Sequence, residues 1–284
     1  TMGRPGLGPM TFHHRPELAQ DQLILAEGVL EVIERELLGI AKYRSLLVQG
    51  GQHVKRGLLL YGPPGNGKTL TIRYLLGRLR EHTVILLTGT GLTAIAPAAS
   101  LARTLEPSIV VLEDVDLVAA ERTGYASHPV LFSVLNELDG IAEDADVAFV
   151  LTTNRADLLE PALAARPGRV DLAVEIGVPD DDGRRRLIEL YGRHLQLQIN
   201  DLEGVIARTR GVAASFMKEL VRKAALLAAH DSDGSQGLTV TEVHLTAALD
   251  ELLSEQSALT RVLLGAAPQH PPHLSRSAGF LSER

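Results

Sequence analysis

The chain has 284 residues, of which 45% are hydrophobic, and it carries a formal net charge of −7. This length exceeds one typical domain of about 150 residues and predicts two lobes, each with its own core. The acidic balance, without a dense basic stretch, argues against tight nucleic-acid binding. The absence of cysteine excludes disulfides and thiol-ligated metal sites.

Membrane insertion and secretion are not predicted. The longest apolar run is far shorter than the roughly 20 residues that cross a bilayer. The segment from Thr1 to Arg15 lacks the apolar stretch of a signal peptide. We therefore expect a cytoplasmic protein without a membrane span.

The first 56 residues are expected to lead into the first domain. Residues 1–16 are rich in Gly, Pro and His, which is typical of a flexible linker. Residues 17–56 are predicted to form a helical lead-in, because Leu and Ile recur at amphipathic spacing from Leu23 to Leu47.

The most informative motif spans eight residues, Gly62-Pro63-Pro64-Gly65-Asn66-Gly67-Lys68-Thr69. It fits the phosphate-loop pattern G-x-x-x-x-G-K-[ST], and it has the required setting of an apolar strand before it and a helical pattern from Leu70 after it. The glycines let backbone N–H groups turn toward phosphate oxygens. Lys68 is expected to reach the β- and γ-phosphates, and Thr69 to bind Mg²⁺. Leu70 is counted with these nucleotide-binding residues.

Apolar strands are expected to alternate with helices over residues 57–178, near 57–61, 84–88, 109–113, 147–152 and 171–176. This alternation predicts a parallel sheet wrapped by helices. The pattern then becomes helical over residues 179–260, and a proline-containing tail at 261–284 is expected to be disordered.

Two of these strands end in polar residues. The third expected strand ends in Glu113-Asp114, followed closely by Asp116, and the fourth leads into Asn154. In phosphate-loop hydrolases, carboxylates at such a strand end hold the metal and polarise the attacking water. For Asp116, helix capping, solvent exposure and a catalytic role all stay open.

The segments Thr153–Leu163 (TNRADLLEPAL) and Arg166–Asp171 (RPGRVD) complete a set of four ordered motifs. Together they resemble the classical AAA clade of the AAA+ ATPases, over roughly residues 20–255. The resemblance implies an α/β fold with a three-layer parallel-sheet domain at 57–178, a small all-helical lid at 179–260, and ATP and Mg²⁺ as cofactors.

The resemblance also implies roles for single residues. Glu113 falls where a metal-linked Asp is usual, and Asp114 where the water-polarising Glu is usual, so the acids are inverted. Asn154 matches the first sensor. Arg166 and Arg169 match two arginine fingers that reach a neighbouring subunit's nucleotide, although either could instead pair with interface acids.

In the lid, Tyr191 and Ala214 fall where the family contacts adenine, although Tyr191 also fits the lid's apolar face. The family's first pore loop corresponds to Thr88–Pro97, which has no aromatic residue. Leu92 or Ile95 could grip an apolar segment there, and turn packing explains both equally well.

The sequence is compatible with three alternative functions. The first is an ATP-hydrolysing homo-oligomer, expected to be a hexameric ring, that remodels protein partners. The second is a nucleotide-binding scaffold with little hydrolysis, suggested by the inverted pair Glu113-Asp114. The third, a nucleic-acid-associated loader, is disfavoured because the chain lacks a basic patch.

Overall fold

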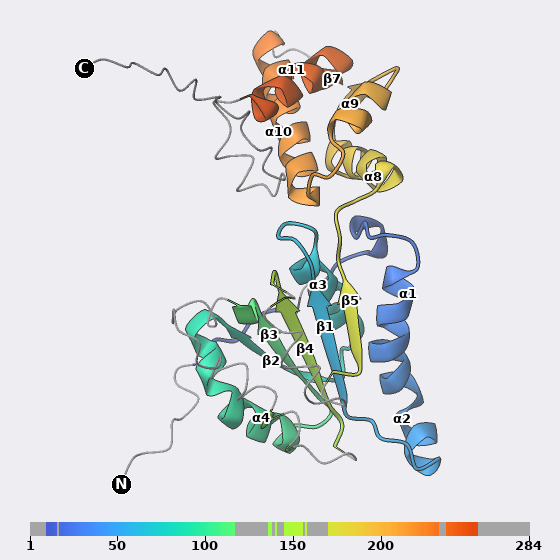
Figure 1. Cartoon of the computed structure of the whole chain (residues 1–284), viewed down its shortest axis with the longest axis vertical. Helices are drawn as coiled ribbons and strands as arrows, with labels where there is room; N and C mark the ends of the chain where they lie inside the picture. The colour runs from blue at the N-terminus through green and yellow to red at the C-terminus, as the bar shows by residue number, and fades with distance from the viewer. Residues whose placement is uncertain are drawn as a thin grey trace, which may run out of the picture.

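The computed structural model describes residues 10–15, 17–116, 136–137, 140, 145–155, 157, 170–232 and 237–254. These residues form a large α/β domain and a smaller lid, drawn at the top of Figure 1. The predicted linker is described only in part, and the predicted tail at 261–284 lies outside the described residues.

The large domain contains a five-stranded sheet in which every pair of neighbours is parallel. In chain order the strands are β1 (Arg56–Tyr61), β2 (Thr83–Thr88), β3 (Ser108–Glu113), β4 (Val147–Thr153) and β5 (Leu172–Glu175). Their spatial order is β2-β3-β4-β1-β5. Because all five run the same way, the residues that follow β1, β3 and β4 meet at one edge of the sheet, which faces the lid in Figure 1.

Helices cover both faces of the sheet. Successive strand residues point to opposite faces. On one face Leu58, Leu60 and Val111 share a core with α1 (Val29–Glu34) and α3 (Lys68–Arg78). The other face packs against η3 and α4, which are Gly89–Ala94 and Ile95–Thr104, through a core that includes Leu59, Val110 and Phe149. The predicted three-layer α/β fold is thereby confirmed.

The helical lead-in starts later than the apolar pattern suggests. A helical run begins only at Val29, as α1, and continues through η2 (Arg35–Gly39) to α2 (Ile40–Gln49). Before it, η1 (Gln20–Gln22) is a single short turn. Gly28, with φ 77°, sets the start of α1, because its backbone is left-handed. Leu46, counted in the apolar pattern, is 67% exposed.

The lid consists of α8 (Asp181–Gly192), α9 (Glu203–Arg208), α10 (Ala214–Asp231) and α11 (Glu242–Leu253), with two short strands. Its core is built on apolar residues of all four helices, among them Leu187, Ile206, Phe216 and Leu249. The strands, β6 (Gln196–Gln198) and β7 (Thr239–Thr241), pair in parallel. They are an addition to the predicted all-helical lid, since three-residue strands carry too little periodic signal to be recognised in the sequence.

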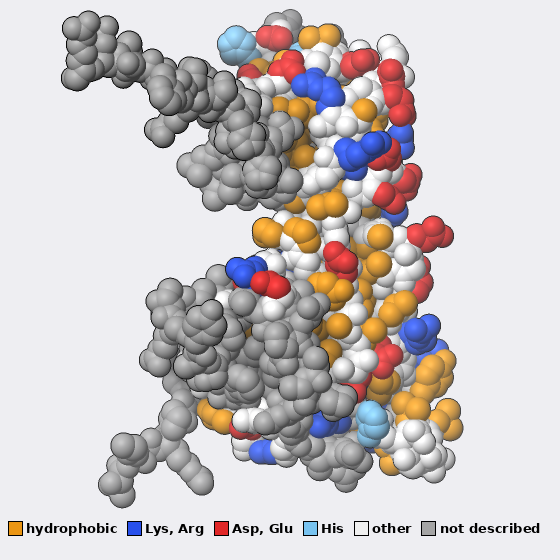
Figure 2. All heavy atoms as spheres, viewed as in Figure 1, with side chains coloured by type: hydrophobic (Ala, Val, Ile, Leu, Met, Phe, Trp, Pro, Cys, Tyr) orange, Lys and Arg blue, Asp and Glu red, His pale blue; other side chains and the backbone are white. Residues whose placement is uncertain are grey.

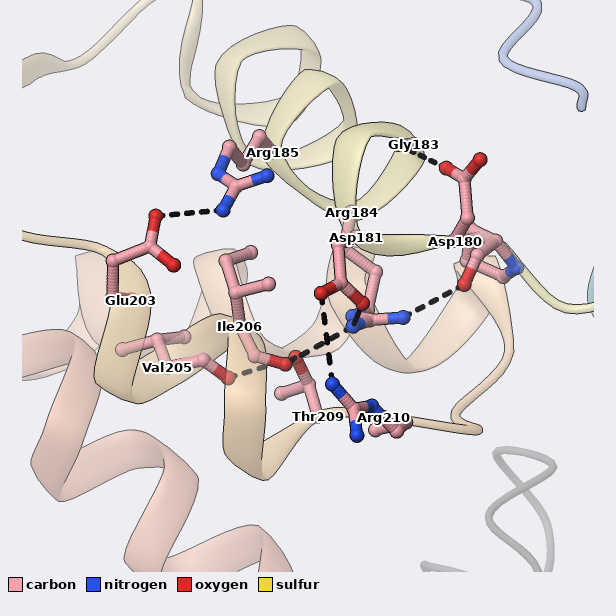
Figure 3. Close-up of polar contacts among 11 residues, drawn as sticks. Asp180, Asp181, Gly183, Arg184, Arg185, Glu203, Val205, Ile206, Thr209 and Arg210 are labelled. Carbon is pink, nitrogen blue, oxygen red and sulfur yellow. Dashed lines mark hydrogen bonds and ion pairs between the residues drawn. The ribbon is translucent and has the colours of Figure 1, made fainter. Parts of the chain in front are cut away.

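A buried arginine links the segment that enters the lid to the lid helices α8 and α9 (Figure 3). Arg184 on α8 is fully buried and donates from Nη1 to the Pro179 carbonyl, at 2.8 Å, and from Nη2 to the Ile206 carbonyl, at 3.1 Å. It also pairs with Asp181. Because Pro179 precedes the lid and Ile206 lies on α9, Arg184 fixes how the chain enters the lid relative to two lid helices.

The described surface mixes both signs of charge. On the face drawn in Figure 2, Lys and Arg side chains are interspersed with Asp and Glu and do not form one broad basic patch among the described residues. Within the same part of the chain, every helix is too short or too polar to span a bilayer.

Candidate active site

The phosphate-loop segment curls over the start of α3. Gly67, with φ 102°, is the residue before the helix, and Lys68 is its first residue. The Lys68 Nζ atom donates to the Gly62 carbonyl at 2.7 Å and to the Pro63 carbonyl at 3.0 Å. Burial lowers the pKa of Lys68, and the charges of Asp114 and Asp116 oppose that shift. The ammonium group is thus held inside the loop, where phosphate oxygens could replace the two carbonyls.

The exposed mouth of the loop is formed by Pro63, Pro64 and Thr69. Its base is tight. A Cβ atom on Gly62, whose φ is 133°, would lie 2.4 Å from the Ile176 carbonyl oxygen. Only glycine fits there, because a side chain would collide with the backbone that follows β5. The loop therefore leaves β1 along a fixed path.

Glu113 ends β3 on the face that carries α3. Strand alternation places it on the side of Ile109 and Val111, both of which belong to the core shared with α3. Its Oε1 atom is buried and has no hydrogen-bond partner among the described residues. A buried acceptor without a donor is costly. Glu113 therefore suits a bound cation on this side of the sheet.

Asp114 and Asn154 lie together at the ends of β3 and β4. The Asn154 Nδ2 atom donates to Asp114 Oδ1 at 3.3 Å. The backbone of Asp114 is left-handed, with φ 52°, and its N–H donates to Thr152 Oγ1 at 2.9 Å. The predicted water-polarising acid and the predicted sensor are thus neighbours, held by a threonine that the sequence reasoning did not single out.

Asp116 is buried at the same edge of the sheet and binds the residues that end β4. It is 9% exposed, and its Oδ1 atom accepts from Thr153 Oγ1 at 2.8 Å and from the Asn154 backbone N–H at 3.0 Å. Burial argues against solvent exposure, and these contacts give Asp116 a role that was not predicted, the support of Asn154. In the sequence, the pair Thr152-Thr153 before Asn154 is the feature that could have indicated these contacts. The Thr152 hydroxyl accepts from the Asp114 backbone N–H, and the Thr153 hydroxyl donates to the Asp116 carboxylate.

A pocket of about 140 Å³ lies between the loop and the lid. Its lining includes Asn66, Leu70, Tyr191 and Ala214, which the sequence reasoning assigned to the nucleotide. Tyr191 also packs against the lid core, and burial raises the pKa of its hydroxyl. The packing agrees with a place on the lid's apolar face, and the adenine contact of Tyr191 stays a prediction. The pocket is also lined by residues that were not predicted to bind the nucleotide, namely Gln22, Leu23, Ile24, Leu187 and Lys218.

The remaining predicted residues divide into two groups. Arg166 and Arg169 lie outside the described residues. Leu92 and Ile95 are buried in the core beneath η3 and α4. Turn packing thus explains both, and the exposed residues of this segment are small or polar.

The residues present fit a magnesium ion that is shared with a nucleotide. Among the described residues, no three His, Cys, Asp or Glu side chains cluster to hold a metal by themselves. Mg²⁺ is usually held by one or two protein oxygens together with substrate phosphates and water. Thr69 at the loop mouth and the buried Glu113 oxygen are two oxygens that could serve in this way.

Comparison with known proteins agrees with this geometry. The model of the ATPase family associated with various cellular activities (AAA) matches residues 58–178. The ATP-dependent zinc metalloprotease FtsH 2 of Sphaerobacter thermophilus is 34% identical over 264 residues, which cover 88% of this chain and 38% of that protein.

Two further proteins are also similar. The proteasome-activating nucleotidase of Methanothermobacter thermautotrophicus is 30% identical, over 80% of this chain and 59% of that protein. The cell division cycle protein 48 homolog of Archaeoglobus fulgidus is 34% identical, over 70% of this chain and 28% of that protein. The chain thus spans less than two thirds of the length of these relatives. Through its AAA domain, the chain belongs to the AAA family of ATPases.

Proposed function

We propose that this chain hydrolyses ATP to ADP and phosphate at the edge formed by the ends of β1, β3 and β4. The contact between Asp114 and Asn154, within the electrostatic reach of Lys68, supports this proposal most strongly. Phosphoryl transfer to water needs a cation that neutralises the phosphates and a carboxylate that polarises the attacking water. It also needs a polar group that orients this water, here the amide of Asn154.

Each residue then has a task. Lys68 neutralises the β- and γ-phosphates. Thr69 and Glu113 would hold Mg²⁺, which would neutralise further phosphate charge. Asp114 polarises the attacking water and takes its proton, and Asn154 holds the Asp114 carboxylate and orients that water. Leu70, Tyr191 and Ala214 line the pocket that would take adenine.

The inverted order of Glu113 and Asp114 leaves one alternative function, a scaffold that binds ATP but hardly hydrolyses it. The fixed position of Asp114 favours hydrolysis, because Thr152 and Asn154 hold its backbone and its side chain. Phosphate release under saturating ATP and Mg²⁺ decides between the two. Tight ATP binding without turnover, in a protein that is assembled, would establish the scaffold.

We further propose that the working form is a homo-oligomer, as a hexameric ring, in which Arg166 and Arg169 reach the nucleotide of the adjacent subunit. An arginine supplied across an interface typically contributes about 10³-fold or more in rate. Arg166→Ala should then bind ATP and lose on the order of 10³-fold in turnover.

A mixing experiment tests this shared site. Arg166→Ala lacks the finger, and Lys68→Ala lacks the phosphate-loop cation, so each protein alone should be inactive. Mixed rings contain some interfaces with an intact loop and an intact finger, and they should regain part of the activity. A rate that is independent of protein concentration, together with a fully active Arg166→Ala protein, would contradict the shared site.

The partner that is remodelled is proposed to be a protein. The mixed charges of the described surface give no support to a nucleic-acid role. The names of two relatives concern a metalloprotease and proteasome activation. The 284 residues contain no His-Glu-x-x-His metal motif, so proteolysis is not proposed for this chain. A cytoplasmic location stays a prediction.

Capture of partners by the Asp114→Asn variant, which should bind ATP without hydrolysing it, would identify the protein that is remodelled.

A further inference from the structure

The longest helix of the lid begins without a cap of its own. The 18-residue helix α10 starts at Ala214, and the residue before it, Ala213, has an extended backbone and no side-chain acceptor. The first N–H groups of a helix have no partner within the helix, and alanine is a poor residue at the capping position. These donors therefore need acceptors from elsewhere.

The phosphate loop supplies them. The Ala214 N–H donates to Asn66 Oδ1 at 3.1 Å, and the Ser215 N–H donates to the Gly65 carbonyl at 2.9 Å. Asn66 is 3% exposed, and its Nδ2 atom donates back to the Pro63 carbonyl at 3.3 Å. Gly65 permits the approach, because a Cβ there would lie 2.2 Å from Ser215 Oγ.

The starts of the other lid helices find side-chain partners within the lid. Asp180 Oδ1 accepts from the Gly183 N–H at 2.7 Å at the start of α8, as Figure 3 shows. Asp201 Oδ1 accepts from the Glu203 N–H at 2.8 Å at the start of α9. At α11, the Thr241 side chain accepts from the His244 backbone N–H, and the Thr241 N–H donates to His244 Nδ1 at 3.1 Å. The start of α10 thus differs from the other three in depending on the large domain.

We propose that Asn66 is a positioning residue that couples the phosphate loop to the lid by capping α10. Its backbone belongs to the loop that would take phosphates, and its side chain holds the lid helix that carries Ala214. A shift of the loop around phosphates is therefore passed to the lid side of the base pocket. This inference rests on the proposed nucleotide binding.

Hydrogen exchange without nucleotide tests the cap. In Asn66→Ala, the amides of Ala214 and Ser215 should exchange about fivefold faster, as expected for the loss of a typical cap. Adding Ala213→Ser supplies a cap within the lid, which reaches the second or third N–H of the helix, and should restore the protection of Ser215. Thr241→Ala is the matched control, because it weakens the start of α11 and should leave α10 unchanged. Unchanged exchange at α10 in Asn66→Ala would overturn the proposal.

Binding of two ligands tests the coupling. ADP would use both the loop and the base pocket, whereas inorganic tripolyphosphate would use the loop alone. Asn66→Ala should weaken ADP binding about fivefold, the factor expected when the hydrogen bond between loop and lid is lost, and should weaken tripolyphosphate binding by a clearly smaller factor. In the double variant with Ala213→Ser, helix protection should return while ADP binding stays weak.

The outcomes are distinct. If ADP binding recovers in the double variant, Asn66 only stabilises the helix, and the coupling is wrong. If ADP binding is unaffected in Asn66→Ala, the coupling is also wrong, and the proposed function stands. If the unmodified chain binds neither ligand, the proposed function fails and the coupling fails with it, whereas the exchange result still reports on the cap.

Discussion

The Asn154 side chain donates to Asp114 Oδ1 across 3.3 Å and joins the ends of two neighbouring strands. The two residues are far apart in the chain, and they meet because β3 and β4 pair in parallel. This pair separates the roles of the two consecutive acids. Asp114 faces the amide, whereas the buried oxygen of Glu113 has no such donor among the described residues.

Exchanging each acid for its amide should therefore give different defects. Asp114→Asn should keep ATP binding and slow hydrolysis by about 10²-fold or more, as the loss of a general base typically does. Glu113→Gln should instead raise the Mg²⁺ concentration needed for half-maximal turnover. Steady-state phosphate release over a Mg²⁺ titration measures both effects. Loss of turnover in Glu113→Gln, with Asp114→Asn fully active, would reverse the assignment.

Lys68→Ala should abolish nucleotide binding, because the loop loses the cation that would compensate the phosphate charge. Calorimetric titration with ATP and Mg²⁺ measures this directly. Arg73→Ala is a suitable control, since Arg73 is an exposed cation on the same helix. The control should bind as the unmodified chain does. Equal ATP affinity in the Lys68 variant would show that the loop does not bind phosphates.

Arg184→Met should destabilise the lid by about 2 kcal/mol, because it keeps much of the volume but removes the arginine donor to the half-buried Pro179 carbonyl and one of the two side-chain donors to the Ile206 carbonyl, which keeps Thr209. Thermal unfolding measures the change, and ADP affinity should fall with it, since α8 carries Tyr191. Arg185→Met removes a neighbouring, more exposed pair with Glu203 and should change stability much less. Similar losses in both variants would argue against Arg184 as the tie at the lid entrance.

Stability should fall in mild acid because of His82. Burial and the charge of Arg56 lower its pKa below the ordinary value of 6.5, while Asp146 opposes the shift and Arg15 and Glu81 contribute less. The unfolded chain then binds a proton that the folded chain does not, so stability decreases as pH falls through about 6.5 and stops decreasing below the folded-state pKa.

Denaturant unfolding between pH 7 and pH 5 tests this sign. One proton contributes a slope of at most about 1.4 kcal/mol per pH unit. His82→Gln should make the pH dependence shallower, whereas the same change at the exposed His53 should not. A His82→Gln protein with an unaltered pH dependence would contradict a buried, neutral His82.

Local pattern was enough to predict much of this protein. Apolar runs gave the five strands to within about two residues, because burial on both faces of a parallel sheet requires such runs. The phosphate-loop motif and the polar strand ends predicted which edge of the sheet would carry the proposed site, since the carboxyl ends of parallel strands meet there.

The tertiary structure decided the contacts between distant segments. The sequence could not show that Asn66 caps α10, that Asp116 supports Asn154, or that Leu92 is buried. Each depends on which strands and helices become neighbours, and hydrophobic periodicity reports only on the local element. The sequence by itself thus determined the fold class and predicted the residues that are proposed to carry the chemistry, and only the packing of the lid and the strand order decided which of those residues are in contact.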